Sequence, residues 1–315
     1  MAGHAPDTAE DRIVREACGL IDRSERGKLA LTGADAKALL QGQVTNDVEA
    51  LAPGSGCYAA VLTPKGKMLG DLRILDSGDE LWLDTERGAL QEVFNTIHRA
   101  RIGFDAELHK RTLQQGLLSL LGPDARRVAG AHAAALSKQE HANARATVDG
   151  VATLLIATDV GVDLVCDAAE TETLAAALRA RGAEPISEAT AECLRVERGR
   201  PRYGLDLDAT TIPQEAGLNE RAVALTKGCY VGQETVARLY YKGKPNRHLR
   251  GLRLSEPVPT GTELTLDGRP VGTLGSVASS PLHGAIGLAL VRREAAPGAL
   301  LDAGAARAEV SELPF

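Results

Sequence analysis

Two stretches of this 315-residue chain have nearly the same pattern, and they constrain its fold more than any other feature. Residues 29–36 are LALTGADA and residues 118–125 are LSLLGPDA; each is an apolar strand, a glycine turn and an Asp-Ala helix start. A repeated pattern of this kind is typical of duplicated units, although a repeat this short also arises by coincidence. It predicts two strand–helix subdomains of α+β type, divided near residue 115.

The segments after each stretch follow the same order. The helix predicted at 87–101 has Leu90, Val93, Phe94 and Ile97 at helical spacing. In the first cycle we expect strands at 27–33, 56–62, 68–75 and 80–83 and helices at 34–41 and 87–101. In the second we expect strands at 118–121, 151–157 and 162–166 and a helix at 170–181.

The pattern changes near residue 245, at a Pro-Asn turn. Short apolar runs then alternate with Gly, Pro and Asp-Gly turns. We expect strands at 249–254, 263–266, 271–278 and 285–291, which predict a small all-β barrel or sandwich. The expected domains are therefore residues 1–245, an α+β region, and residues 246–315, a C-terminal β-barrel.

Composition excludes several classes of protein. The net charge of −6 disfavours a general polyanion binder. Five cysteines, odd in number and without a C-x-x-C, predict free thiols in a reducing compartment and no self-contained metal site. No apolar run is long enough for a membrane helix, and the N-terminus lacks the character of a leader. We therefore expect a cytoplasmic protein that binds no membrane.

The segment 227–234, KGCYVGQE, is the most informative about function. Gly228 and Gly232 predict a tight turn or a close backbone approach. Lys227, with Arg238 further along, would stabilise a thiolate at Cys229 if they lie near it. A surface turn with an inert Cys is the alternative. The other cysteines (18, 57, 166 and 193) stand in strand-like or helix-like sequence, so we expect them to be buried and slow to react.

This octet resembles that of the YgfZ family of folate-binding proteins, which are relatives of the aminomethyltransferase, or T-protein, of glycine cleavage. Other segments resemble the family in the same order, from about residue 40 to 240. They are QGQVTNDV at 41–48, TPKGKMLGDL at 63–72, RVERGRP at 195–201 and IPQE at 212–215. The resemblance implies a T-protein-like fold and, as cofactor, tetrahydrofolate or a derivative.

Candidate cofactor-binding residues follow from the same resemblance. Glu197 lies in the element that carries a pterin-facing carboxylate in folate-binding relatives, with folate expected between the α+β subdomains. Arg195, with Arg198, Arg200 and Arg202, would serve the glutamyl tail or form a solvated basic face. The full set of predicted cofactor contacts is Asn46, Asp47, Arg195, Glu197, Lys227, Tyr230, Gln233 and Arg238. Asn46 and Asp47 also suit an ordinary turn.

Asp71 is the residue at which the enzyme and non-enzyme interpretations of this sequence differ. T-proteins carry an acidic pair in this hairpin, whereas this chain has Gly70-Asp71. The resemblance therefore favours an accessory protein in which Cys229 supports iron–sulfur enzymes, including tRNA-modifying ones, with those enzymes or cluster-assembly proteins as partners. The first alternative is a tetrahydrofolate-dependent aminomethyltransferase, in which Asp71 is catalytic. Whether the chain is an enzyme stays open here.

Residues 238–250 form the one basic stretch with interleaved aromatic residues. Such a stretch suits RNA phosphates or a folate tail, and equally a plain basic turn. It supports a second alternative, an RNA-interaction protein with a vestigial folate site.

Overall fold

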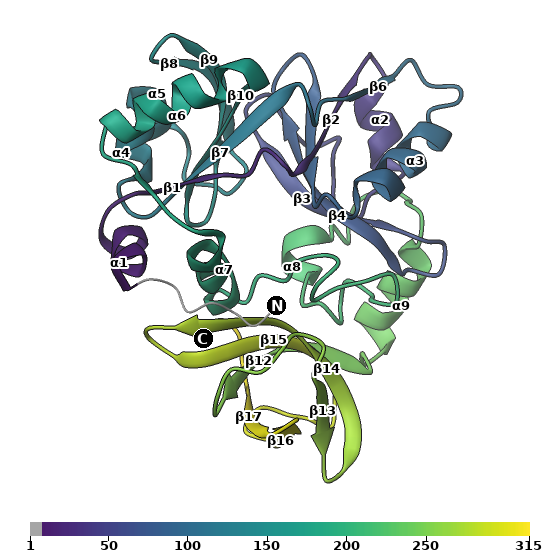
Figure 1. Ribbon diagram of the computed structural model, residues 1–315. Helices are drawn as coiled ribbons and strands as arrows, with labels where there is room; N and C mark the ends of the chain where they lie inside the picture. Colours follow the sequence, from purple (N-terminus) through teal and green to yellow (C-terminus); the bar gives the residue numbers. More distant parts are fainter. Residues whose placement is uncertain (1–7) are drawn as a thin grey trace. The chain divides into compact units, whose positions relative to one another are not determined.

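The two predicted cycles form one antiparallel sheet and one mixed sheet in the computed structural model, which describes residues 8–315 (Figure 1). The chain divides into two compact units. The two-sheet unit comprises residues 12–186 and 220–233. The barrel unit comprises residues 187–219 and 234–315 with the described residues up to 11.

The first sheet has the strand order β3-β4-β5-β2-β6, and the second has β11-β1-β7-β10-β9-β8. Helices α2 and α3 belong to the first cycle, and α4, α5 and α6 to the second. The first cycle consists of β2 Gly27–Thr32, α2 Ala36–Gln41, β3 Gly56–Leu62, β4 Met68–Asp76, β5 Leu81–Thr85, α3 Leu90–Ala100 and β6 Glu107–Lys110. The second consists of β7 Gln115–Leu121, α4 Ala125–Ala129, α5 Ala131–Ala135, β8 Asn143–Val148, β9 Val151–Ala157, β10 Gly161–Asp167, α6 Thr171–Ala180 and β11 Glu184–Pro185.

The two cycles have the same connectivity, which confirms the predicted pair of subdomains. The neighbours β3-β4-β5-β2 in one sheet correspond to β8-β9-β10-β7 in the other. The turn glycines also correspond: Gly33 has φ +107° and Gly122 has φ +119°. A Cβ would lie 2.3 Å from Asp105 O at Gly33 and 2.6 Å from Ala17 O at Gly122. Both turns therefore require glycine.

Four strands of this unit, β1, β6, β8 and β11, were not predicted. β1 Gly19–Asp22 lies antiparallel to β7 and separates it from the two-residue strand β11. In the first sheet the corresponding position beside β2 is occupied by β6. A four-residue strand has too few positions to show a period, so its pairing decides its conformation.

The two sheets share an apolar contact. Leu75 and Trp82 of the first sheet pack with Leu117, Leu154 and others of the second. Trp82 is 1% exposed, and its Nε1 donates to Gln115 Oε1 at 2.9 Å. The second sheet buries its own cluster of Leu, Val and Ala side chains under α4 and α6.

The barrel unit contains a closed antiparallel barrel of strand order β12-β15-β14-β13-β16-β17, which confirms the predicted all-β barrel. The strand pattern of the sequence did not reveal β16 and β17, whose pairing closes the barrel. α7 Glu188–Glu197 packs against β14 and β15 through Cys193 and Val196. The strands are β12 Arg247–Leu254, β13 Glu263–Leu266, β14 Arg269–Ser280, β15 Gly284–Arg292, β16 Leu300–Ala303 and β17 Ala306–Ser311. The remaining helices are α1 Thr8–Glu16, α8 Asn219–Ala222 and α9 Gln233–Lys242.

Candidate functional site

Cys229 lies in the loop between α8 and α9, and its thiol is exposed. Cys18, Cys166 and Cys193 are buried, as expected. Cys57, at the start of β3, is partly exposed, so it is less enclosed than the sequence suggested. Burial nevertheless raises the pKa of the Cys57 thiol to about 12, which disfavours its reactive thiolate. The fold therefore presents Cys229 as the accessible thiol among residues 8–315.

Lys227 holds the Cys229 loop in place. Its Nζ donates to three backbone carbonyls, Gln41 O at 2.6 Å, Val44 O at 2.7 Å and Asn46 O at 2.9 Å. The residue is 8% exposed, and burial lowers the pKa of its ammonium to about 8. Three acceptors use all the N–H bonds of an ammonium. The Lys227 ammonium therefore donates its hydrogen bonds to the 41–46 segment and not to the thiol of Cys229.

Two further contacts fasten the same loop. Val231 N donates to Gly42 O at 3.2 Å. Gly232 has φ +86°, and a Cβ there would lie 2.7 Å from Thr63 O in the turn of the β3–β4 hairpin. Three of the segments that resemble YgfZ, at 41–48, 63–72 and 227–234, therefore meet within the two-sheet unit.

The predicted contacts Asn46 and Asp47 serve this junction. Asn46 Nδ2 donates to Tyr58 O at 2.8 Å and to Arg221 O at 3.3 Å, which ties β3 to α8. Asp47 Oδ1 accepts from Gln41 Nε2 at 3.0 Å, within the same turn. Both side chains thus have structural partners, as the turn alternative anticipated.

Tyr230 and Gln233 follow Cys229 in the chain. Tyr230 is buried, with its ring 5.0 Å from Lys227 Nζ, and burial raises the pKa of its hydroxyl to about 12. Gln233 begins α9. Its backbone N donates to Tyr230 O at 3.2 Å, which closes the turn after Cys229.

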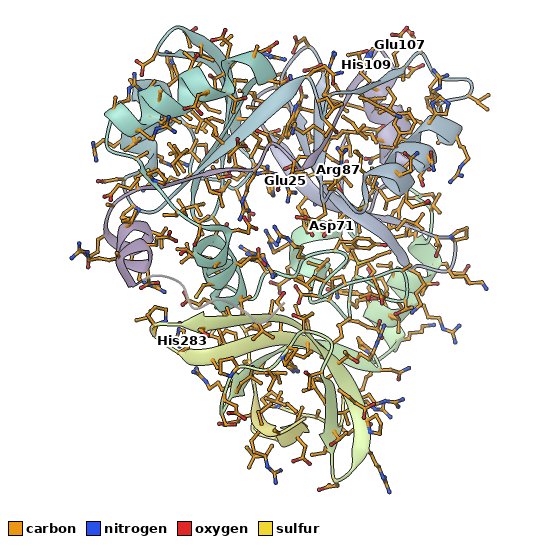
Figure 2. The ribbon with its side chains drawn as sticks, viewed as in Figure 1. Glu25, Asp71, Arg87, Glu107, His109 and His283 are labelled. Atoms are coloured by element: carbon orange, nitrogen blue, oxygen red, sulfur yellow. The ribbon has the colours of Figure 1, made fainter. Side chains whose placement is uncertain are left out.

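Asp71, on β4, is a buried carboxylate of the two-sheet unit (Figure 2). Tyr58 Oη donates to its Oδ2 at 2.5 Å. Burial raises the pKa of Asp71 to about 6, opposed by the Tyr58 hydrogen bond and reinforced by the charge of Glu86. A carboxyl group in this range gains and loses its proton near neutral pH.

Arg221 extends this pair in a way that the sequence did not indicate. Its guanidinium lies 5.1 Å from the centre of the Tyr58 ring, and its NH2 donates to Glu140 Oε1 at 2.6 Å. The four residues of this group come from four separate segments of the chain, so no local sequence pattern predicts that they lie together. They are Tyr58, Asp71, Glu140 and Arg221.

Gly70 occupies the position at which the sequence lacks the second acid. A Cβ at Gly70 would lie 2.9 Å from both Ala89 Cβ and Val93 Cγ2, beside α3. Real Cβ atoms essentially never approach so closely. A carboxylate side chain at this position would therefore require Ala89 and Val93, at the start of α3, to shift.

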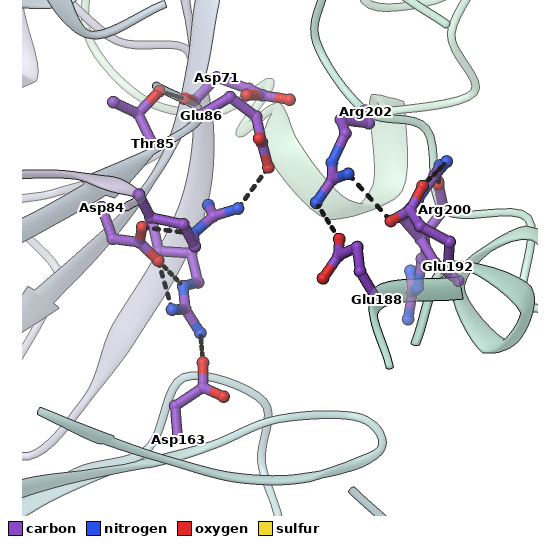
Figure 3. Close-up of polar contacts among 12 residues, drawn as sticks. Asp71, Asp84, Thr85, Glu86, Asp163, Glu188, Glu192, Arg200 and Arg202 are labelled. Atoms are coloured by element: carbon purple, nitrogen blue, oxygen red, sulfur yellow. Dashed lines mark hydrogen bonds and ion pairs between the residues drawn. The ribbon is translucent and has the colours of Figure 1, made fainter. Parts of the chain in front are cut away.

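A chain of buried ion pairs lies next to Asp71 (Figure 3). Arg26 pairs with Glu86 and with Asp84 Oδ1, the latter at 2.8 Å. Arg73 joins Asp84 Oδ2 at 2.6 Å to Asp163 Oδ2 at 2.6 Å, which connects the first sheet to β10 of the second. Burial by itself would raise the pKa of Asp84, but the charges and hydrogen bonds of these two arginines outweigh it and lower that pKa.

The predicted pterin-binding residue, Glu197, belongs to the barrel unit and ends α7. It is 8% exposed, and its Oε1 accepts from Ser280 Oγ at 2.5 Å and from Cys193 Sγ at 3.6 Å. Ser280, the last residue of β14, thus holds this carboxylate by a hydrogen bond.

The neighbouring arginines are largely committed to ion pairs. Arg195 donates to Asp206 Oδ2 at 2.9 Å and pairs with Glu192 at 2.8 Å. Burial by itself would lower the pKa of Arg195, but the neighbouring carboxylates Asp206 and Glu192 outweigh it and raise that pKa. Arg202 contacts Glu188 and Glu192, each at 3.1 Å (Figure 3). Arg238 is exposed on α9.

Within residues 8–315, no three His, Cys, Asp or Glu side chains gather as metal ligands. The helices of this part of the chain are all too short or too polar to cross a bilayer.

Two family models match the chain. Residues 4–227 match the GCVT N-terminal domain, and residues 247–314 match the C-terminal β-barrel domain of CAF17. The chain belongs to the GCVT N-terminal domain family. The combination of the two domains confirms the YgfZ-type resemblance of its motifs.

Individual relatives agree with this assignment. An aminomethyltransferase of Staphylococcus saprophyticus is 27% identical over 91% of this chain and 82% of its own length. A putative chloroplastic transferase of Arabidopsis thaliana is 28% identical over 88% of this chain and 66% of its own length. The crystal structure of aminomethyltransferase T of the Bartonella henselae glycine cleavage system is 24% identical, with a TM-score of 0.86 over 98% of this chain and 88% of that one. It has the same fold.

Proposed function

We propose that this chain is a folate-binding accessory protein that supports iron–sulfur enzymes, including tRNA-modifying ones, through the thiol of Cys229. One observation carries the proposal: Cys229 is exposed on a loop that Lys227 and Gly232 anchor to the 41–46 segment and the β3–β4 hairpin. An anchored loop with an open thiol suits chemistry with a partner molecule. A reducing compartment such as the cytoplasm would keep that thiol free.

The folate part of the proposal rests on the family and on Glu197. A pterin presents several N–H donors, and a buried carboxylate satisfies them, whereas each donor left unpaired costs roughly 1–3 kcal/mol. Glu197 is a buried carboxylate within the segment that resembles the pterin-facing element. Tetrahydrofolate or a derivative is the ligand that we propose.

Calorimetric titration with tetrahydrofolate tests this part. Glu197→Gln keeps an acceptor for Ser280 but removes the charge, and it should weaken binding at least tenfold. Ser280→Ala is the matched control, because it removes the internal hydrogen bond and leaves the carboxylate. Equal affinity of wild type and Glu197→Gln would remove Glu197 from the folate site.

The proposed thiol chemistry is tested by selective alkylation. Limiting iodoacetamide near neutral pH should label Cys229 before the other cysteines, as mapped by mass spectrometry. Cys229→Ser should then abolish support of iron–sulfur enzymes in a strain that lacks the protein, and Cys57→Ser should preserve it. Because a cluster normally has four protein ligands, Cys229 would act with a partner and not alone. Full complementation by Cys229→Ser would make this thiol merely structural.

Aminomethyl transfer is the alternative that the names of the relatives favour. We propose that this chain lacks it, because the second acid of the T-protein pair is absent and α3 fills its place at Gly70. Incubation with an aminomethylated lipoyl carrier and tetrahydrofolate should yield no methylenetetrahydrofolate above background. Robust product, lost in Asp71→Ala, would establish the transferase.

RNA interaction is a second candidate, favoured by the end of α9. Tyr240 is 50% exposed and Tyr241 68% exposed, and Arg238, Lys242 and Lys244 beside them are also exposed. Exposed aromatic rings next to cations suit stacked bases and phosphates. Binding to a single-stranded RNA should then weaken steeply as salt is raised, and in Tyr240→Ala/Tyr241→Ala. Binding that is unchanged in this variant would exclude the surface.

A further inference from the structure

The flank of α3 forms a pocket in the two-sheet unit that the proposed function does not use. Val93 and Ile97 are fully buried and fasten the helix to its sheet, whereas Leu90 and Phe94, one turn apart, lie on its flank. A Cβ at Gly27 would lie 3.0 Å from Leu90 Cβ, so helix and β2 approach closely at one end. Beside this contact is a cavity of ≈ 290 Å³.

The floor and wall of the cavity are apolar. Leu29 of β2 forms part of the floor, with Leu90 and Phe94 from α3. Leu113, just after β6, completes the wall and is 81% exposed. Leu113 is therefore an exposed apolar side chain at the edge of a concave apolar surface. A ligand bound in the cavity would cover it.

The charge of the cavity is opposite to that of the chain. Its lining includes Arg87 and Lys110 but no Asp or Glu, although the chain has 42 acidic and 36 basic residues. Within residues 8–315 neither cation forms an ion pair with a carboxylate, in contrast to the buried arginines nearby. Lys110 Nζ lies 4.5 Å from the centre of the Phe94 ring, so its charge points over the apolar surface.

We propose that this pocket binds a small organic anion, an apolar ring or branched chain that ends in a carboxylate. The apolar body would lie on Leu29, Phe94 and Leu113, and the carboxylate would meet Arg87 and Lys110. Ligand sites in proteins have volumes of about 300–1,000 Å³. The cavity of ≈ 290 Å³ is therefore close to the lower limit and suits a molecule the size of a bicyclic aromatic acid. The site includes none of the residues assigned to folate or to the thiol.

The test uses 2-naphthoate as the anionic probe and 2-naphthylmethanol as its neutral counterpart. Each is titrated into the isotope-labelled full chain, with affinity measured from amide shifts in NMR spectra. Naphthoate should shift amides of residues 87–94 and 110–114, and the alcohol should bind at least tenfold more weakly. Arg87→Gln/Lys110→Gln should lower naphthoate affinity at least tenfold. Leu113→Ser should lower the affinity for both probes.

Arg101→Gln is the matched control, because Arg101 is an exposed cation just beyond α3 that does not line the cavity. It should bind naphthoate as wild type does. Equal affinity for naphthoate and alcohol, unchanged binding in the double variant, shifts confined to other residues, or no binding at about 10 mM would each overturn the proposal. Tetrahydrofolate titration of the double variant should match wild type, so this result is independent of the folate proposal.

Discussion

Asp71 shows how burial changes the chemistry of one residue. Its carboxyl group lies beside the Tyr58 hydroxyl, with little access to water, and burial is the main cause that raises its pKa from 3.8 to about 6. The folded state therefore binds this proton more tightly than the unfolded state does. The stabilisation is complete below about pH 4 and is lost as the pH rises through about 6.

Asp71→Asn removes this dependence. Relative to wild type, the variant should gain on the order of 2–3 kcal/mol in unfolding free energy between pH 4 and pH 7. Urea unfolding of both proteins at several pH values measures the difference. Asp79→Asn is a useful contrast, because its hydrogen bond with Arg145 lowers the pKa of Asp79 and the trend should reverse. A difference between Asp71→Asn and wild type that is constant with pH would contradict the assignment.

In this structure the ammonium of Lys227 donates hydrogen bonds to three backbone carbonyls of the 41–46 segment. Lys227→Met should cost about 2–3 kcal/mol of stability, because three buried acceptors lose a charged donor. Amide hydrogen exchange should accelerate at residues 41–48 and 227–233. Slower alkylation of Cys229 with unchanged hydrogen exchange would instead support a direct role of Lys227 at the thiol.

At the scale of elements, the contact of α3 with β4 decides whether residue 70 can carry a side chain. Gly70→Ala should destabilise the protein by roughly 1–3 kcal/mol, because the added methyl overlaps Ala89 and Val93. Gly88→Ala is the matched control, since nothing lies within 4 Å of its added Cβ, and it should be neutral or stabilising. Thermal melts of the two variants give the comparison. Equal stability would show that α3 shifts freely and that the absent acid has another cause.

Across the two-sheet unit as a whole, the pair Arg73–Asp163 connects the duplicated halves through their cores. Asp163→Asn should cost about 3 kcal/mol, because a buried guanidinium loses one of its two carboxylates. A double-mutant cycle with Arg73→Met isolates the coupling between the two residues. A coupling near zero would mean that this ion pair does not hold the halves together and that other contacts, such as those of Trp82, do so.

Much of the architecture follows from local sequence. The LALTGADA and LSLLGPDA segments predict equivalent strands and helices, and the positive φ values of Gly33 and Gly122 explain why both contain that glycine. The turns and apolar runs after residue 245 likewise predict a barrel. β1, β6, β8, β11 and the last two barrel strands are exceptions, because short strands are determined by their partners.

The amino-acid sequence by itself determined the family, the pair of similar subdomains and the identity of the Cys229 loop, because these depend on neighbouring residues. Only the tertiary structure decided what those residues touch. Asn46 and Arg221 are 175 positions apart and share a hydrogen bond, and the Tyr58–Asp71 pair acquires its raised carboxyl pKa only when it is buried. Likewise, Lys227 binds carbonyls and Gly70 faces a helix because segments distant in the chain pack there. Contacts and desolvation are properties of the assembled core, so no local pattern contains them.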